Sequence, residues 1–381
     1  MSPFPRLDPP DKYLLEHFAS CTLCPRRCHV NRLAGEPGYC GQTARLRAAR
    51  AALHMWEEPC ISGSTGSGTV FFSGCSLGCI YCQNQDIALG QAGREITPQR
   101  LTEIFLELQQ KGAANINLVT PTHFVPLIVH ALEQARDHGL SLPVVYNCGG
   151  YESVDALKML DGLVDIYLPD FKYASGELSA RFSHVADYLE KAKLALAEMY
   201  RQVGRPVFAA PSDSLSIRPS LGPAAPPSTQ PTPQPSTRPS DRLSTQPPGR
   251  PSHRLSAQTP DRPFDRLSDA DTASVYPSDT PLLRRGMIVR HLVLPGQVGD
   301  SKKILHYLRD TYGNNIYVSV MRQYTPLPQV AHIPGLNRRV TEAEYQRVVD
   351  FCLRLGMENV YIQEGDTARE SFIPPFNFTG L

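Results

Sequence analysis

The chain has 381 residues, 41% of them apolar, so it can bury a sizeable core as one large domain or two ordinary ones. Its 38 Lys and Arg against 37 Asp and Glu give a net charge of +1, which offers no basic surface for nucleic acid and no acidic tail. We see no signal peptide, and the longest apolar runs fall far short of the roughly 20 residues that a membrane span needs. We therefore expect a soluble, cytoplasmic protein that binds neither nucleic acid nor membrane.

Along the chain, apolar runs rich in β-branched residues alternate with segments whose apolar residues recur at helical spacing. The runs predict strands at residues 69–73, 116–119, 144–146, 164–168, 287–294, 316–320 and 360–362. The helical patterns cover residues 98–112, 122–138, 153–160, 179–203, 300–312 and 341–356. This alternation predicts an α/β fold with a parallel sheet and helices outside it, in a full or partial (β/α) barrel.

Residues 211–280 differ from the rest of the chain. They hold 15 of the 35 prolines and 13 serines, and the triplet Arg-Leu-Ser recurs every 12 residues from Arg242. Such a segment has too little apolar surface to offset the entropy of ordering, so we predict a disordered insertion, either a tolerated surface loop or a tether. The predicted organisation is a Cys-rich segment at 1–60, a barrel in two parts at 61–210 and 281–381, and the insertion between them.

Three of the ten cysteines follow the first predicted strand with the spacing C-x₃-C-x₂-C, as Cys75, Cys79 and Cys82. Clustered cysteines in a long cytosolic chain indicate a metal or catalysis more often than disulfides. Three thiolates in one loop can bind three irons of a cubane cluster and leave the fourth without a protein ligand. An open iron can take a substrate or cofactor, and the alternative is a zinc or electron-transfer site.

Polar or ligand-type residues also stand at the predicted carboxyl ends of the other strands. Because chemistry in such barrels takes place at these ends, the pattern predicts a shared active face. These strand ends read Thr120-Pro121-Thr122-His123, Asn147-Cys148-Gly149-Gly150, Asp170-Phe171-Lys172, Arg290-His291 and Met321-Arg322-Gln323.

The cysteine loop, with the aromatic Tyr81 directly before its last cysteine, resembles the radical S-adenosylmethionine (SAM) superfamily. In that family the open iron of a [4Fe–4S] cluster binds SAM, and an electron cleaves SAM to methionine and a 5′-deoxyadenosyl radical that abstracts hydrogen. Several further parts of the chain resemble the subgroup related to pyruvate formate-lyase activating enzyme. They are His54, Glu57 and Glu58, residues 66–72 and Gln83-Asn84 around the cysteine loop, and the segments at 170–173, 289–296 and 321–324. The resemblance covers residues 21–205 and 286–381 and implies an oxidoreductase.

The resemblance also implies roles for single residues, with no catalytic residue beyond the cluster ligands. Tyr81 would contact the adenine region, and Asn147 would reach the polar groups of SAM. Arg290 would pair with a carboxylate or ribose of SAM, a role that suits a planar guanidinium. Asp170 and Lys172 match an element that lies beside SAM and a monovalent cation in the activating enzymes.

One motif departs from the family pattern. Most members carry Gly-Gly-Glu at the end of the second strand, where it holds the amino group of SAM. This chain has Thr120-Pro121-Thr122 there. We expect the hydroxyl of Thr120 or Thr122, with a backbone carbonyl, to take that role.

A second cysteine group has the spacing C-x₂-C-x₃-C-x₁₁-C, formed by Cys21, Cys24, Cys28 and Cys40. Four thiolates suit either tetrahedral zinc or an Fe–S cluster, and the spacing does not separate the two. We predict a second metal site here.

Four functions are compatible with these patterns. The first is radical hydrogen abstraction from a protein or peptide, as in glycyl-radical activation, with a one-electron donor such as flavodoxin or ferredoxin. The second is the same chemistry on a small molecule. A non-catalytic Fe–S electron-transfer protein and a zinc-dependent binding module are the others. The open three-thiolate loop argues against the third function, and the length of the barrel argues against the fourth.

Overall fold

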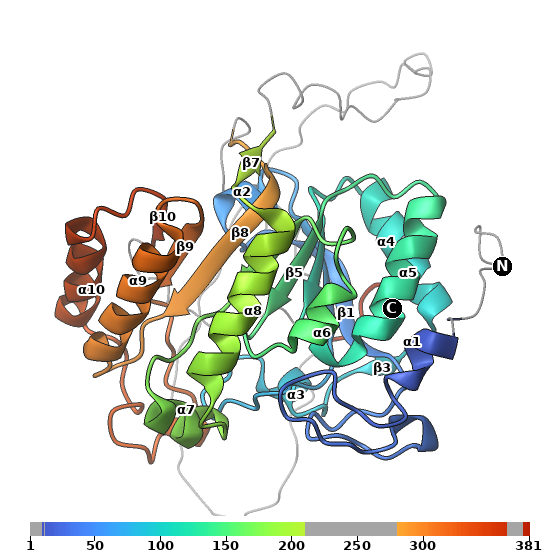
Figure 1. Ribbon diagram of the computed structural model, residues 1–381, viewed down its shortest axis with the longest axis horizontal. Helices are drawn as coiled ribbons and strands as arrows, with labels where there is room; N and C mark the ends of the chain where they lie inside the picture. The colour runs from blue at the N-terminus through green and yellow to red at the C-terminus, as the bar shows by residue number, and fades with distance from the viewer. Residues whose placement is uncertain (1–9, 11, 210–279, 364–375) are drawn as a thin grey trace, which may run out of the picture. The chain divides into compact units, whose positions relative to one another are not determined.

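The computed structural model describes residue 10 and residues 12–209, 280–363 and 376–381 (Figure 1). All of these residues fall in one compact unit of the chain. The predicted disordered insertion at 211–280 lies outside the described residues, except for Thr280.

The described strands form a 10-stranded, mostly parallel sheet. They are β1 (Arg47–His54), β2 (Ser67–Phe72), β3 (Arg94–Glu95), β4 (Ile116–Val119), β5 (Val144–Cys148), β6 (Ile166–Pro169), β7 (Val207–Phe208), β8 (Leu283–Leu292), β9 (Tyr317–Met321) and β10 (Val360–Ile362). Their order is β10-β9-β8-β6-β5-β4-β2-β1-β3, with β7 paired to β8. All seven predicted strands are confirmed, and they pair in parallel with one another. Among the described strands the sheet stays open, with β10 and β3 at its edges, so they do not close a barrel.

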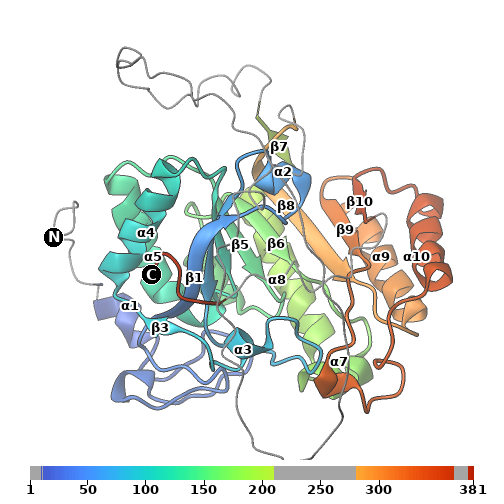
Figure 2. The same cartoon turned by 180° about the vertical axis from the view of Figure 1, so that it is seen from behind.

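Helices cover one face of this sheet. The helices are α1 (Lys12–Glu16), α2 (Pro59–Ser62), α3 (Gln85–Ala88), α4 (Pro98–Gln110), α5 (Val125–Asp137), α6 (Val154–Lys158), α7 (Gly176–Ser183), α8 (Tyr188–Val203), α9 (Val298–Tyr312) and α10 (Glu342–Arg354). Figure 1 shows α5, α6 and α8 in front of the strands of the sheet, and the reverse view in Figure 2 shows the strands, with β1 foremost, in front of α8. This arrangement confirms the predicted mixed α/β class, with helices outside a parallel-rich sheet.

The predicted single helix at 179–203 is wrong. Two helices, α7 and α8, occupy this region, and α7 begins earlier, at Gly176. The chain turns after α7 because His184 adopts the left-handed conformation, with φ of 58° and its backbone N–H donating to the Ser179 carbonyl. A non-glycine residue in this conformation ends a helix, as left-handed caps commonly do.

Strand β1 was not predicted, because its Ala- and Arg-rich sequence favours a helix. It forms a strand through long-range pairing instead. It lies antiparallel to β2, and on its other side the Ala51 N–H donates to the Thr379 carbonyl at 2.8 Å. Tertiary contacts therefore override local propensity in this segment.

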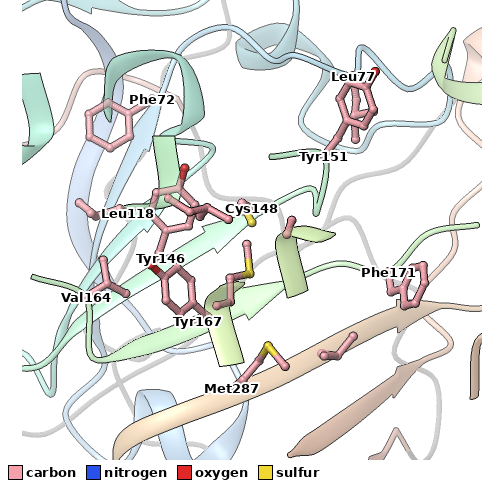
Figure 3. Close-up of a cluster of buried hydrophobic side chains, with 14 of the residues drawn as sticks. Phe72, Leu77, Leu118, Tyr146, Cys148, Tyr151, Val164, Tyr167, Phe171 and Met287 are labelled. Atoms are coloured by element: carbon pink, nitrogen blue, oxygen red, sulfur yellow. The ribbon is translucent and has the colours of Figure 1, made fainter. Parts of the chain in front are cut away.

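The two faces of the sheet differ in character because successive residues of a strand point to opposite sides. Figure 3 shows Phe72, Leu118 and Tyr146, from three neighbouring strands, in the hydrophobic core. Asn117 on β4 and Asn147 on β5 point to the other face. The side-chain amides of both residues donate to the Glu57 carboxylate. The candidate site lies on this second face, which also carries a smaller apolar cluster that includes Val145, Ile166, Leu168 and Ile288.

Candidate metal and cofactor site

The three cysteines of the C-x₃-C-x₂-C motif lie just beyond the carboxyl end of β2. The Leu77 N–H donates to the Cys75 Sγ at 3.4 Å, and the Ser183 hydroxyl donates to the Cys79 Sγ at 2.9 Å. The thiols of Cys79 and Cys75 both raise the pKa of Cys82, so the three side chains interact electrostatically. Hydrogen-bond donors at thiolate sulfurs are typical of Fe–S sites.

Burial is the main cause of the raised thiol pKa values in this loop. It raises the pKa of Cys75 to about 11 and that of Cys82 to about 12, and the neighbouring thiol of Cys79 adds to both shifts. The Lys172 ammonium acts in the opposite direction on both groups. Without a metal these thiols keep their protons at neutral pH, so binding of iron must displace them.

A glycine in the cysteine loop allows this loop to approach the N-terminal segment closely. Gly74 has φ of 92°, a conformation that favours glycine. A Cβ at this position would lie 2.6 Å from the Gln42 Cγ and 2.7 Å from the Cys40 carbonyl oxygen. The absence of a side chain is therefore what allows the two cysteine-bearing segments to meet.

The predicted strand-end residues come together around the Arg290 guanidinium on β8. Its Nε donates to the Asp170 carboxylate at 3.1 Å, and its Nη1 donates to the Glu57 carboxylate at 3.2 Å. Its Nη2 donates to the Asn147 side-chain oxygen on β5. Asp170 also accepts from the Lys172 Nζ at 2.5 Å. The structure thus unites Asn147, Asp170, Lys172 and Arg290, as the strand-end pattern predicted.

The charges in this group stabilise one another. Burial alone would lower the pKa of Arg290, but the carboxylates of Asp170, Glu58 and Glu57 raise it above its usual value. Burial alone would raise the pKa of Asp170, but Lys172 and Arg290 hold it below its usual value. The pKa of Glu58 is raised, mainly by burial, so this is the carboxyl group that the site pushes toward its neutral form.

The remaining predicted residues lie around this group. Thr120 has φ of 57°, rare for a β-branched residue, and its N–H donates to the Asn147 carbonyl at 2.9 Å. The Thr122 hydroxyl donates to the buried Glu152 carboxyl at 2.8 Å. The hydroxyl oxygen of Tyr81 lies 2.7 Å from that of Tyr173, and Tyr81 is buried. Their roles toward SAM stay predictions.

The four N-terminal cysteines also gather in one place. A Cβ at Gly38 would lie 3.6 Å from the Cys40 Sγ and 3.8 Å from the Cys28 Sγ. Burial raises the pKa of Cys24 to about 12, and the thiols of Cys40 and Cys21 add to this shift. Within the described residues, no three His, Cys, Asp or Glu side chains are arranged to hold a single metal ion, the cysteines of the C-x₃-C-x₂-C loop included, so both metal sites stay predictions.

Arg26, between two of these cysteines, fastens the N-terminal segment to the cysteine loop. Its guanidinium donates to the carbonyls of Ser76 at 2.9 Å, Leu77 at 3.3 Å, Ser183 at 3.1 Å and His184 at 2.8 Å. Four carbonyls from two distant segments thus converge on one side chain, which fixes the cysteine loop against the end of α7.

Sequence reasoning assigned no role to Glu57 or Ser183, and it treated Arg26 only as a positive charge that offsets the N-terminal thiolates. Each acts through a partner at least 50 residues away in the sequence. In the sequence, Glu57 could be noted only as one of two adjacent acidic residues in a segment that resembles the activating-enzyme subgroup. No local spacing could have indicated Ser183.

Comparison with known proteins identifies the domain that carries this site. Residues 69–209, which include the cysteine loop and strands β4 to β6, match the model of the Radical SAM superfamily. The chain therefore contains a radical SAM domain.

The chain is also similar to the uncharacterized protein MJ0674 of Methanocaldococcus jannaschii. The two are 31% identical over 182 residues, which cover 45% of this chain and 51% of that protein. The chain thus spans about half the length of the curated relative it matches. Among the described helices, none has both the length and the apolar character that a bilayer crossing requires.

Proposed function

We propose that this chain is a radical SAM enzyme in which Cys75, Cys79 and Cys82 bind a [4Fe–4S] cluster and leave one iron open for SAM. The observation that carries the proposal is the group of three thiols at the carboxyl end of β2, inside the matched domain. Three thiolates with a vacant fourth corner suit a cluster that binds a further ligand. When bound, the cluster supplies the electron that cleaves SAM to methionine and a 5′-deoxyadenosyl radical.

The residues around Arg290 would bind and orient SAM. The guanidinium is held by Glu57 and Asp170 before any ligand arrives, so its planar donors are already oriented for a carboxylate or ribose. Asn147 contributes a second polar group on the same face. Lys172, which counters the charge of the cysteine thiolates, would favour their metal-bound form.

We propose further that the enzyme is an oxidoreductase of the activating-enzyme type, which abstracts hydrogen from a protein such as a glycyl-radical enzyme. The support is the resemblance of its cysteine loop and strand-end segments to that subgroup. A small molecule is the alternative substrate. A flavodoxin or ferredoxin would supply the electron. The ten free cysteines fit a reducing compartment, and we propose the cytoplasm.

The N-terminal cysteines Cys21, Cys24, Cys28 and Cys40 would bind a second metal, either zinc or an Fe–S cluster. The support is their grouping and the mutual influence of their thiols. We propose that residues 1–60 form this Cys-rich segment and that 61–210 and 281–381 are the two parts of a partial barrel.

Anaerobic reconstitution tests the main proposal. Protein reconstituted with iron and sulfide should bind a [4Fe–4S] cluster and, once reduced, convert SAM to methionine and 5′-deoxyadenosine. Cys79→Ala should abolish this cleavage. Cys352→Ala, a change at a buried cysteine in α10, should retain it. Cleavage that survives in Cys79→Ala would rule out the proposed cluster.

Metal analysis of the same samples addresses the second site. A Cys21→Ala/Cys24→Ala double variant should lose the metal of the N-terminal site while keeping the iron bound by Cys75, Cys79 and Cys82. Equal metal content in this variant and the wild type would contradict a second site.

A further inference from the structure

A buried pair of hydroxyl groups lies against one cysteine of the proposed cluster site. Ser183, the last residue of α7, donates from its Oγ to the Cys79 Sγ at 2.9 Å. The Ser183 Oγ also lies 2.7 Å from the hydroxyl of Tyr173. Both Ser183 and Tyr173 are fully buried. Hydrogen bonds in such a low-dielectric environment are stronger than hydrogen bonds at the surface.

The direction of these hydrogen bonds follows from the state of the sulfur. A cysteine that binds iron is a thiolate, which has no proton to donate and can only accept. Ser183 has a single hydroxyl hydrogen, and it points to the sulfur. The Tyr173 hydroxyl, which also contacts Ser183, donates its one hydrogen to the Tyr81 hydroxyl at 2.7 Å. The donor that faces Cys79 is therefore the Ser183 hydroxyl alone.

The backbone holds this contact in place from both sides. The Ile80 N–H donates to the Phe182 carbonyl at 3.0 Å, which joins the cysteine loop to the end of α7. The Arg26 guanidinium donates to the carbonyls of Ser183 at 3.1 Å and Leu77 at 3.3 Å. These bridges fix the backbone of Ser183 relative to the cysteine loop.

We infer that Ser183 is a positioning residue that raises the reduction potential of the cluster through its hydrogen bond to Cys79. The inference rests on the proposed function, because it requires a [4Fe–4S] cluster on the three thiolates. Reduction adds negative charge to the cluster, and a donor at a ligand sulfur stabilises the reduced form more than the oxidised form. The hydrogen bond from Ser183 to Cys79 therefore makes the reduced state, which SAM cleavage needs, easier to reach.

A redox titration of the reconstituted protein, followed by the electron paramagnetic resonance signal of the reduced cluster, tests this inference. Ser183→Ala should shift the midpoint potential to a more negative value at unchanged iron content.

Ser179→Ala is the matched control. Ser179 is also buried on α7, but its hydroxyl donates to the Gly176 carbonyl at 3.1 Å. Its replacement should leave the potential unchanged. A Ser183→Ala protein with full iron content and the wild-type potential would overturn the inference while the proposed function stands. Wild-type protein that binds no iron at the three cysteines would overturn both.

Discussion

Arg290 on β8 donates to the Glu57 carboxylate at 3.2 Å, although 233 residues separate the two in the sequence. Glu57 also accepts from the Asn117 side chain at 2.9 Å, so it connects β8 to β4. Both side chains are largely buried, at 16% and 8% exposure. The pair therefore positions the polar side chains around Arg290, where we propose that SAM binds.

We expect Arg290→Met to destabilise the protein by about 3–5 kcal/mol, because it removes the buried cation that the carboxylates of both Glu57 and Asp170 contact. Urea unfolding gives the free energy. Arg45→Met is the matched control, since its ion pair with Glu95 is exposed and should contribute about 1 kcal/mol or less. Equal losses in the two variants would contradict the structural role of Arg290.

Gly150→Ala should disrupt the site. Gly150 has φ of 76°, and a Cβ there would lie 2.1 Å from the Asp170 carbonyl oxygen. Gly162 has a similar φ of 82° but open space around it, so Gly162→Ala should show only the backbone cost of about 1–2 kcal/mol. Thermal unfolding of both variants separates steric clash from strain, and a smaller loss in Gly150→Ala would be inconsistent with the observed packing.

Arg26→Lys should loosen the cysteine loop, because a single ammonium cannot serve four carbonyls in the planar geometry of a guanidinium. Hydrogen exchange should become faster for the amides of residues 75–82, and iron uptake on reconstitution should fall. Its exposed neighbour Arg27 offers the control, and Arg27→Lys should match the wild type in both measurements. Unchanged exchange in Arg26→Lys would mean that the loop is held by other contacts.

The buried Glu152 should make stability depend on pH. Burial raises its pKa from 4.5 to about 7, against hydrogen bonds from Thr122 and Tyr146 that lower it. The folded protein therefore keeps this proton over a range in which the unfolded chain loses it. Its contribution to stability is fully present below about pH 4.5 and is lost as the pH rises toward 7.

Glu152→Gln removes this titration. The difference in unfolding free energy between wild type and variant, measured in urea from pH 4.5 to 8, should shift in favour of the variant as the pH rises. A difference that stays constant over this range would show that Glu152 ionises in the folded protein as it does in the unfolded chain.

The sequence by itself determined the repeating units of the fold and the cysteine loop. The seven parallel strands were predictable because apolar residues in consecutive positions are a local signal. The three cysteines 75, 79 and 82 were recognisable because all lie within eight residues of one another.

Only the tertiary structure decided how these parts meet. It made a strand of β1 despite its helical composition, because pairing with β2 contributes more than local propensity does. It also placed Ser183 on Cys79, across 104 residues, and Glu57 on Arg290. Such contacts depend on where distant segments cross in space, and periodicity and spacing carry no information about those crossings.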